Sequence, residues 1–199
     1  MCRAAAAAAG AAAGARLASS TYLAMLASPL RRCAATHTVL PAALLVPLRL
    51  VAAPAGPMFV PDGIERRARR PGPGAWVCAD QHVVRAFCAR TPAAPAAPAL
   101  IALVSHQLQQ RVVQEAARVR GVHGPPAARL DYAAAERMRT WTDGAPHYHL
   151  GTLAHELQAQ LHTHLEAAGI SGGTLPRGGT TALGIALWRL ASWIDSDST

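Results

Sequence analysis

Apolar residues recur at every third or fourth position through the second half of the chain, and this spacing predicts amphipathic helices. A first apolar stripe begins at Ala99 and ends before Gly121, where Pro125 and Pro126 add a further helix stop. Three more helices are expected over 128–141, over 150–168, and from Thr180 or Thr181 to Ile194. Short loops between four helices predict a mainly α fold, a small four-helix bundle over about 99–195.

The last of these helices is apolar almost all round, so we expect it to be buried inside the bundle or covered by a partner. No stretch of the sequence is long and apolar enough to predict a membrane-spanning helix.

One segment before the bundle has the residue types of strands. Residues 76–78 and 82–88 flank Asp80 and Gln81, a pattern that predicts a β-hairpin over 75–89. Around it, residues 58–98 are expected to form a basic Pro/Gly linker that ends in a stiff Ala-Pro spacer. The helical domain then occupies 99–199.

Charge divides the 199-residue chain unevenly. All 19 basic residues are arginine, against 11 acids, for a formal net charge of +8. Residues 1–57 hold five arginines and no acid, whereas 99–199 hold eight of each. An acid-free Ala/Arg-rich start is typical of a mitochondrial or plastid targeting segment, so 1–57 is expected to be a targeting or disordered low-complexity arm. Without import the protein would be cytoplasmic, and translation starting at Met58 is a further alternative.

A cluster of arginines lies in the expected linker. Its members are Arg66, Arg67, Arg69 and Arg70. Such a cluster can contact anions, so we expect RNA, if it binds at all, to bind through this basic part of the chain. The helical domain has no excess positive charge with which to neutralise phosphates.

Histidine is concentrated in one place, because five of the nine lie in 147–164. The candidate metal ligands are His147, His149, His155 and His162, and imidazole ligands suit zinc or manganese. His155-Glu156 begins like a zincin motif, but Ala159 occupies the position of the second histidine, which excludes that class. The four cysteines are scattered and are expected to be buried as small hydrophobic residues.

The segment from Pro146 to Leu150, Pro-His-Tyr-His-Leu, resembles the metal-binding motif of rolling-circle replication initiators and relaxases. The resemblance implies paired histidines on a strand that hold a divalent cation, and a tyrosine that attacks a DNA phosphodiester. It covers five residues and departs elsewhere: no tyrosine follows Tyr148, Tyr132 lies upstream, and the segment is expected between helices rather than in a sheet.

Three functional hypotheses follow. The first is a non-enzymatic accessory or assembly subunit, imported into an organelle, that docks on a larger protein or ribonucleoprotein and needs no cofactor. The second is a metal-dependent enzyme, hydrolase or nuclease-like, built on the His147–His164 cluster. The third is an unselected GC-rich reading frame without function.

Overall fold

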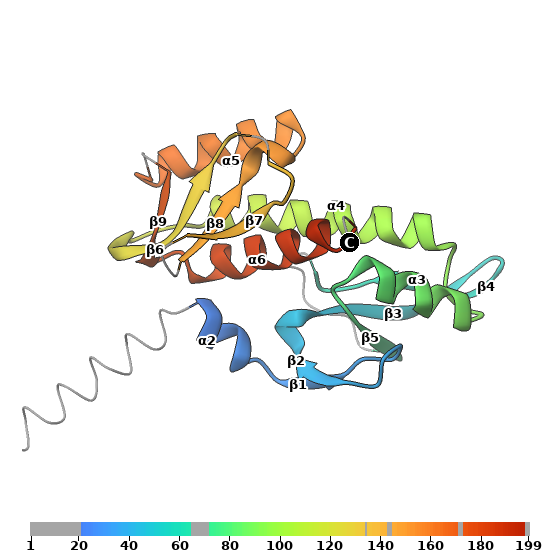
Figure 1. Cartoon of the computed structure of the whole chain (residues 1–199). Helices are drawn as coiled ribbons and strands as arrows, with labels where there is room; N and C mark the ends of the chain where they lie inside the picture. The colour runs from blue at the N-terminus through green and yellow to red at the C-terminus, as the bar shows by residue number, and fades with distance from the viewer. Residues whose placement is uncertain (1–20, 65–71, 134, 143–144, 171–172, 198–199) are drawn as a thin grey trace, which may run out of the picture.

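The computed structural model describes residues 21–64, 72–133, 135–142, 145–170 and 173–197, which form a mixed α/β fold (Figure 1). The helices are α2 (Thr21–Leu26), α3 (Gln81–Arg90), α4 (Ala97–Ala116), α5 (His155–Ala167) and α6 (Thr181–Asp195), with short 3-10 helices η1 (Ala42–Leu44) and η2 (Leu150–Thr152). The strands are β1 (Leu30–Arg32), β2 (Val39–Pro41), β3 (Leu45–Ala53), β4 (Gly56–Pro61), β5 (Gly74–Cys78), β6 (His123–Asp131), β7 (Arg139–Thr142), β8 (Ala145–His149) and β9 (Thr174–Gly178).

The described strands make three sheets, so the expected mainly α four-helix bundle is wrong. β1 and β2 form a two-stranded sheet, β4-β3-β5 an antiparallel one, and β7-β8-β6-β9 a mixed one. Three of the expected helices are present as α4, α5 and α6.

The expected helix over 128–141 is instead the end of β6, a connection, and most of β7. Pro125 and Pro126 lie within β6, before the expected start of this helix. Downstream, Ala128 and Leu130 are buried while Arg129 is exposed, which is the alternation of a strand with one covered face. The helical spacing of Leu130, Ala134 and Met138 was therefore coincidental.

The expected N-terminal arm is also wrong for the part that the structure describes. β3 is the central strand of its sheet, and Leu45, Val46 and Leu48 are at most 1 % exposed. They belong to one hydrophobic core that continues through α4, α5 and α6. Pro47 lies one residue beyond the last β3–β4 pair, Leu48–Pro61. The strand therefore needs no amide donor from residue 47 toward β4, and a proline is tolerated there. Residues 1–20 lie outside the described residues.

The expected hairpin over 75–89 is wrong, because only its first half is a strand and the two halves do not pair with each other. Its first half is β5, which pairs with β3. Its second half is α3, because the Asp80 carboxylate accepts a hydrogen bond from the amide of Val83 at 3.1 Å and so caps a helix rather than turning a hairpin.

Helix α6 connects the antiparallel sheet to helix α4. The Arg189 guanidinium donates to the carbonyl of Leu45 at 2.8 Å, and the Trp193 indole donates to the Ser105 hydroxyl of α4 at 2.7 Å. Burial and the neighbouring Arg111 cation lower the pKa of Arg189 to about 10. Because its apolar face is used inside this core, α6 is not an open docking surface. No described helix has both the length and the apolar character needed to cross a membrane.

The shared core makes a prediction about Leu45, whose side chain is fully buried. Leu45→Ala should lower the free energy of unfolding of the whole chain by about 2 to 5 kcal/mol, because it removes buried methyl groups and leaves a cavity. The measurement is denaturant unfolding followed by circular dichroism, in which the helices dominate the signal. Leu30→Ala, at a side chain 60 % exposed, is the matched control and should change stability by no more than about 0.5 kcal/mol. An unchanged helical transition in Leu45→Ala would show that β3 is not part of this core.

Candidate metal centre

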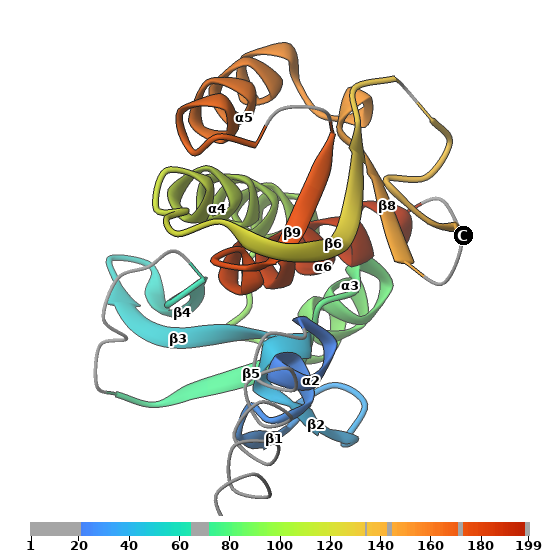
Figure 2. The same ribbon diagram turned by 90° about the vertical axis from the view of Figure 1, so that its left-hand side faces the viewer.

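The mixed sheet presents one covered face and one open face. Helices α4 and α5 lie on one side of β6, β8 and β9 (Figure 2). We call the opposite side of the sheet the open face, because side chains on it are 14 to 42 % exposed. Ala128, Leu130 and Tyr148 point toward the helices and are buried. Because side chains alternate along a strand, the residues between them lie on the open face.

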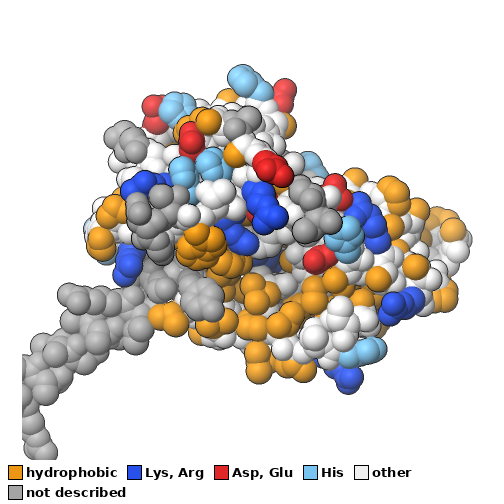
Figure 3. Space-filling view, in the orientation of Figure 1, with side chains coloured by type: hydrophobic (Ala, Val, Ile, Leu, Met, Phe, Trp, Pro, Cys, Tyr) orange, Lys and Arg blue, Asp and Glu red, His pale blue; other side chains and the backbone are white. Residues whose placement is uncertain are grey.

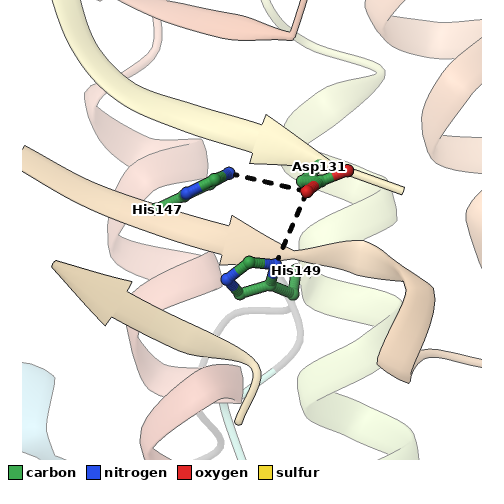
Figure 4. Close-up of side chains that lie close together, drawn as sticks. All are labelled: Asp131, His147 and His149. Atoms are coloured by element: carbon green, nitrogen blue, oxygen red, sulfur yellow. Dashed lines mark ion pairs between the residues drawn. The ribbon is translucent and has the colours of Figure 1, made fainter. Parts of the chain in front are cut away.

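Parallel pairing of β6 with β8 brings three of these open-face residues together. Asp131 is the register partner of His149, and Arg129 is the partner of His147. Asp131 Oδ2 lies 3.9 Å from His147 Nε2 and 3.7 Å from His149 Nδ1 (Figure 4). All three ligand atoms lie within 4.8 Å of one another, close enough to bind one ion.

The spacing suits a shared cation better than direct hydrogen bonds. Both distances from Asp131 exceed those of a charge-assisted hydrogen bond. Two ligands on one zinc ion, each about 2.1 Å from it at a tetrahedral angle, lie roughly 3.4 Å apart. To bind one zinc ion, the three ligand atoms, which now lie within 4.8 Å of one another, would have to move closer together.

The His149 ring has one satisfied nitrogen and one buried nitrogen that faces the carboxylate. Its Nε2 lies 3.0 Å from the Thr140 hydroxyl on β7, whereas Nδ1 is buried and has no hydrogen-bond partner among the described residues. A proton on Nε2 that is donated to Thr140 leaves the Nδ1 lone pair directed at the site. Metal-bound histidines are oriented in this way, by a hydrogen bond from the other ring nitrogen.

Asp131 is oriented by its own backbone. Its Oδ1 accepts a hydrogen bond from the amide of Ala133 at 2.9 Å, which leaves Oδ2 directed at the two imidazoles. The side chain is 42 % exposed, against 14 % for His149, so the cluster opens to solvent on the carboxylate side. A ligand set of two imidazoles and one carboxylate with an open side is characteristic of catalytic rather than structural metal sites.

The covered face of the sheet fixes this arrangement. Tyr148 lies between the two histidines in sequence and is buried on the opposite face, and burial raises the pKa of its hydroxyl. The amide of His149 donates to the carbonyl of Met138 at 2.7 Å, and the Met138 amide donates to Asp195 of α6 at 2.7 Å. Strands β7 and β8 are thus tied to each other and to α6.

The open face around the cluster is polar. Arg129 is exposed on the same face as Asp131 and is the direct cross-strand neighbour of His147. Figure 3 shows histidine, arginine and acidic side chains at the surface over this sheet, whereas hydrophobic side chains gather toward the lower right of the view. Arg129 thus adds a positive charge to the face that carries the cluster.

The structure separates the four histidines predicted as ligands into two pairs. His147 and His149 are in the cluster, but His155 and His162 are exposed on α5. His162 Nε2 pairs with Glu166 at 3.2 Å and packs edge-on against Tyr132. Among the described residues, the Asp131, His147 and His149 set is the one cluster with metal-binding geometry.

The predicted anion-contact residues Arg66, Arg67, Arg69 and Arg70 lie outside the described residues.

Sequence reasoning missed Asp131 and Thr140. The available signal was alternation: in Arg129-Leu130-Asp131 and in His147-Tyr148-His149, polar residues flank one buried residue. Two such segments predict two strands that can pair, but each is very short and the first was assigned to a helix.

The implied strand context of the Pro146–Leu150 resemblance is present, since His147 and His149 are on β8 and not between helices as expected. Neither of the two tyrosines whose side chains the structure describes lies at the cluster. Tyr148 is buried on the other face, and Tyr132 contacts His162 on the side of α5.

Compared with protein-family models, with curated proteins and with solved structures, the chain gave no match in any of the three. What the cluster does is therefore inferred from its geometry and from the chemistry of its side chains.

Proposed function

We propose that this protein is a divalent-metal-dependent enzyme that hydrolyses phosphodiesters at the open face of the mixed sheet. The observation that carries the proposal is the convergence of Asp131, His147 and His149, with the buried His149 Nδ1 lacking a hydrogen-bond partner among the described residues. Zinc and manganese are the cations that best suit two imidazoles and a carboxylate.

The three ligands leave coordination positions open toward solvent. A divalent cation in such a site supplies Lewis acidity, which polarises a phosphoryl oxygen and activates water as a nucleophile. With no tyrosine placed at the cluster among the described side chains, water is the nucleophile that the geometry supports, and hydrolysis is the corresponding reaction.

Arg129 supports a phosphate-containing substrate. It is exposed, it neighbours His147 across the β6–β8 pair, and its guanidinium suits phosphate oxygens. The His-Tyr-His strand also resembles a motif that serves phosphodiester chemistry. Together these features favour a phosphodiester over a neutral substrate.

A second candidate is the accessory or assembly subunit. Four apolar side chains of α2, β1 and β2 are 38 to 60 % exposed: Leu23, Leu26, Leu30 and Val39. Such a surface suits a protein partner. The accessory role makes no use of Asp131, His147 and His149, so measurements of metal binding and turnover distinguish the two candidate functions. The organellar location and the RNA contact stay predictions.

The first prediction concerns metal affinity. The full chain, freed of metal by a chelator, should bind one Mn²⁺ in calorimetric titration. The double variant His147→Ala/His149→Ala should bind at least about 100-fold more weakly, since loss of two ligands exceeds the 10- to 100-fold cost of losing one supporting residue. The matched control is His155→Ala/His162→Ala, which should stay within about twofold. Equal loss in both double variants would contradict the assigned ligand set.

The second prediction concerns Thr140 as a positioning residue. Thr140→Val should weaken metal binding by about 10-fold, because His149 loses the hydrogen bond that orients its ring. Thr140→Ser keeps the hydroxyl and should restore the affinity. Long-range ¹H–¹⁵N NMR of the imidazole should show the Nε2-protonated form of His149 in the wild type and a mixture of forms in Thr140→Val. If the serine variant binds as weakly as the valine variant, the hydroxyl is not the cause.

The third prediction concerns turnover. With Mn²⁺, the protein should hydrolyse bis(4-nitrophenyl) phosphate, and Asp131→Ala should reduce kcat/KM by at least about 100-fold through loss of a metal ligand. Arg129→Ala should mainly raise KM, because it removes a substrate contact and leaves the ligands intact. His155→Ala/His162→Ala is again the control. A protein that binds metal stoichiometrically but cleaves neither this ester nor DNA and RNA oligonucleotides would refute the enzyme and leave the metal site standing.

A further inference from the structure

Two cysteines from distant parts of the sequence meet beside the antiparallel sheet. Cys33 directly follows β1 and Cys78 ends β5. The amide of Ala34 donates to the carbonyl of Trp76 at 2.7 Å, which fixes the two backbone segments side by side. The amide of Cys78 itself donates to Cys33 Sγ at 3.4 Å, across 45 positions of sequence.

The two thiol groups share the same small set of contacts. Thr36 reaches both, through its amide to Cys33 Sγ at 3.5 Å and through its hydroxyl to Cys78 Sγ at 3.8 Å. The Cys33 sulfur thus lies against the backbone of Cys78, and Thr36 lies against both sulfurs. From this placement we expect a disulfide to need rotation of the side chains rather than a large movement of the backbone.

The surroundings favour a thiolate on Cys33. Burial alone would raise its pKa, but hydrogen bonds from the Thr36 hydroxyl and from nearby backbone amides outweigh burial and hold the pKa of Cys33 below that of a free thiol. Burial and the neighbouring Cys33 raise the pKa of Cys78. The thiolate is the form that attacks disulfides, so Cys33 is the stronger candidate for the final, internal attack.

We infer that Cys33 and Cys78 form a dithiol site that low-molecular-weight disulfides oxidise reversibly to an internal disulfide. Cys33 is fully buried and Cys78 is half-buried, so an external disulfide reaches Cys78 first.

With oxidised glutathione as the oxidant, the exchange balances in two steps. The Cys78 thiolate attacks one glutathione sulfur, forms a mixed disulfide and releases one glutathione thiolate. The Cys33 thiolate then attacks Cys78 Sγ, the Cys33–Cys78 bond forms, and the second glutathione thiolate leaves. The protein dithiol loses two electrons and two protons, and oxidised glutathione is reduced to two thiols.

Cys88 is the internal control. It is half-buried on α3, and its pKa is raised by burial alone. No cysteine among the described residues contributes to its pKa, and it should retain, at most, a mixed disulfide.

The test incubates the full chain with oxidised glutathione, blocks free thiols with an alkylating agent, and maps tryptic peptides by mass spectrometry. Cleavage after Arg32, Arg85 and Arg90 places Cys33, Cys78 and Cys88 on separate peptides. The expected result is a Cys33–Cys78 linked pair that reduced glutathione reverses. Cys33→Ala should stop at a stable mixed disulfide on Cys78, and Cys88→Ser should behave as wild type.

The thermal midpoint supplies a second measurement. The oxidised wild type should melt at a higher temperature than the reduced form, because the bond closes a 45-residue loop of the unfolded chain. Persistence of glutathione on Cys78 in the wild type, or full alkylation of Cys33 after treatment, would overturn the inference.

Discussion

The parallel pairing of β6 with β8 is the constraint on which the candidate centre depends. The buried faces of these strands, which include Leu130 and Tyr148, must pack against the helices, because α4, α5 and α6 contribute to the same hydrophobic core. Alternation then forces Asp131, His147 and His149 onto the opposite face. A slip of one residue would turn every side chain over, burying the carboxylate and exposing the aromatic ring, at a cost in both desolvation and lost apolar burial. The hydrophobic pattern that stabilises the sheet therefore also sets the distances within the cluster.

The third neighbour, β7, completes this arrangement through α6. The Arg139 guanidinium lies over the Trp188 ring at 3.9 Å, and burial lowers the pKa of Arg139. Together with the bond between the Met138 amide and Asp195, this contact fixes β7 against the helix. Thr140 contacts His149 from this strand. The Met138 bond to Asp195 fixes the start of the strand, and the Arg139 contact with Trp188 fixes its covered face. The orientation of one imidazole ring is thus coupled to the packing of α6.

The sequence predicted the long helices and missed the sheets for a physical reason. The Leu and Val stripes of α4, α5 and α6 span several turns each, and only a helix satisfies such a pattern. The alternation in β6 and β8 covers three or four residues, which a helical spacing also fits, and the prolines of β6 weaken the strand signal further. His147 and His149 were predicted from residue type alone. Asp131 was not predicted, because it meets the two histidines through the pairing of β6 with β8, and β7 lies between these strands in the sequence. His155 and His162 are closer to His149 in the sequence, but they lie on α5, away from the cluster. The charge division along the chain is real, but it does not separate a folded part from an unfolded one, since β3 lies in the common core.

The two candidate sites differ in the ligands they offer, and this difference decides how metal binding should be interpreted. Thiolates are soft ligands that bind zinc tightly, whereas carboxylate and imidazole also accept manganese. Zinc added to the reduced protein therefore has a second place to bind, at Cys33 and Cys78, although two sulfur ligands alone leave its coordination shell incomplete. Manganese has little affinity for thiolates, so it reports on Asp131, His147 and His149 alone. Residual zinc binding in a histidine variant is consequently no argument against the metal centre unless manganese binding persists as well.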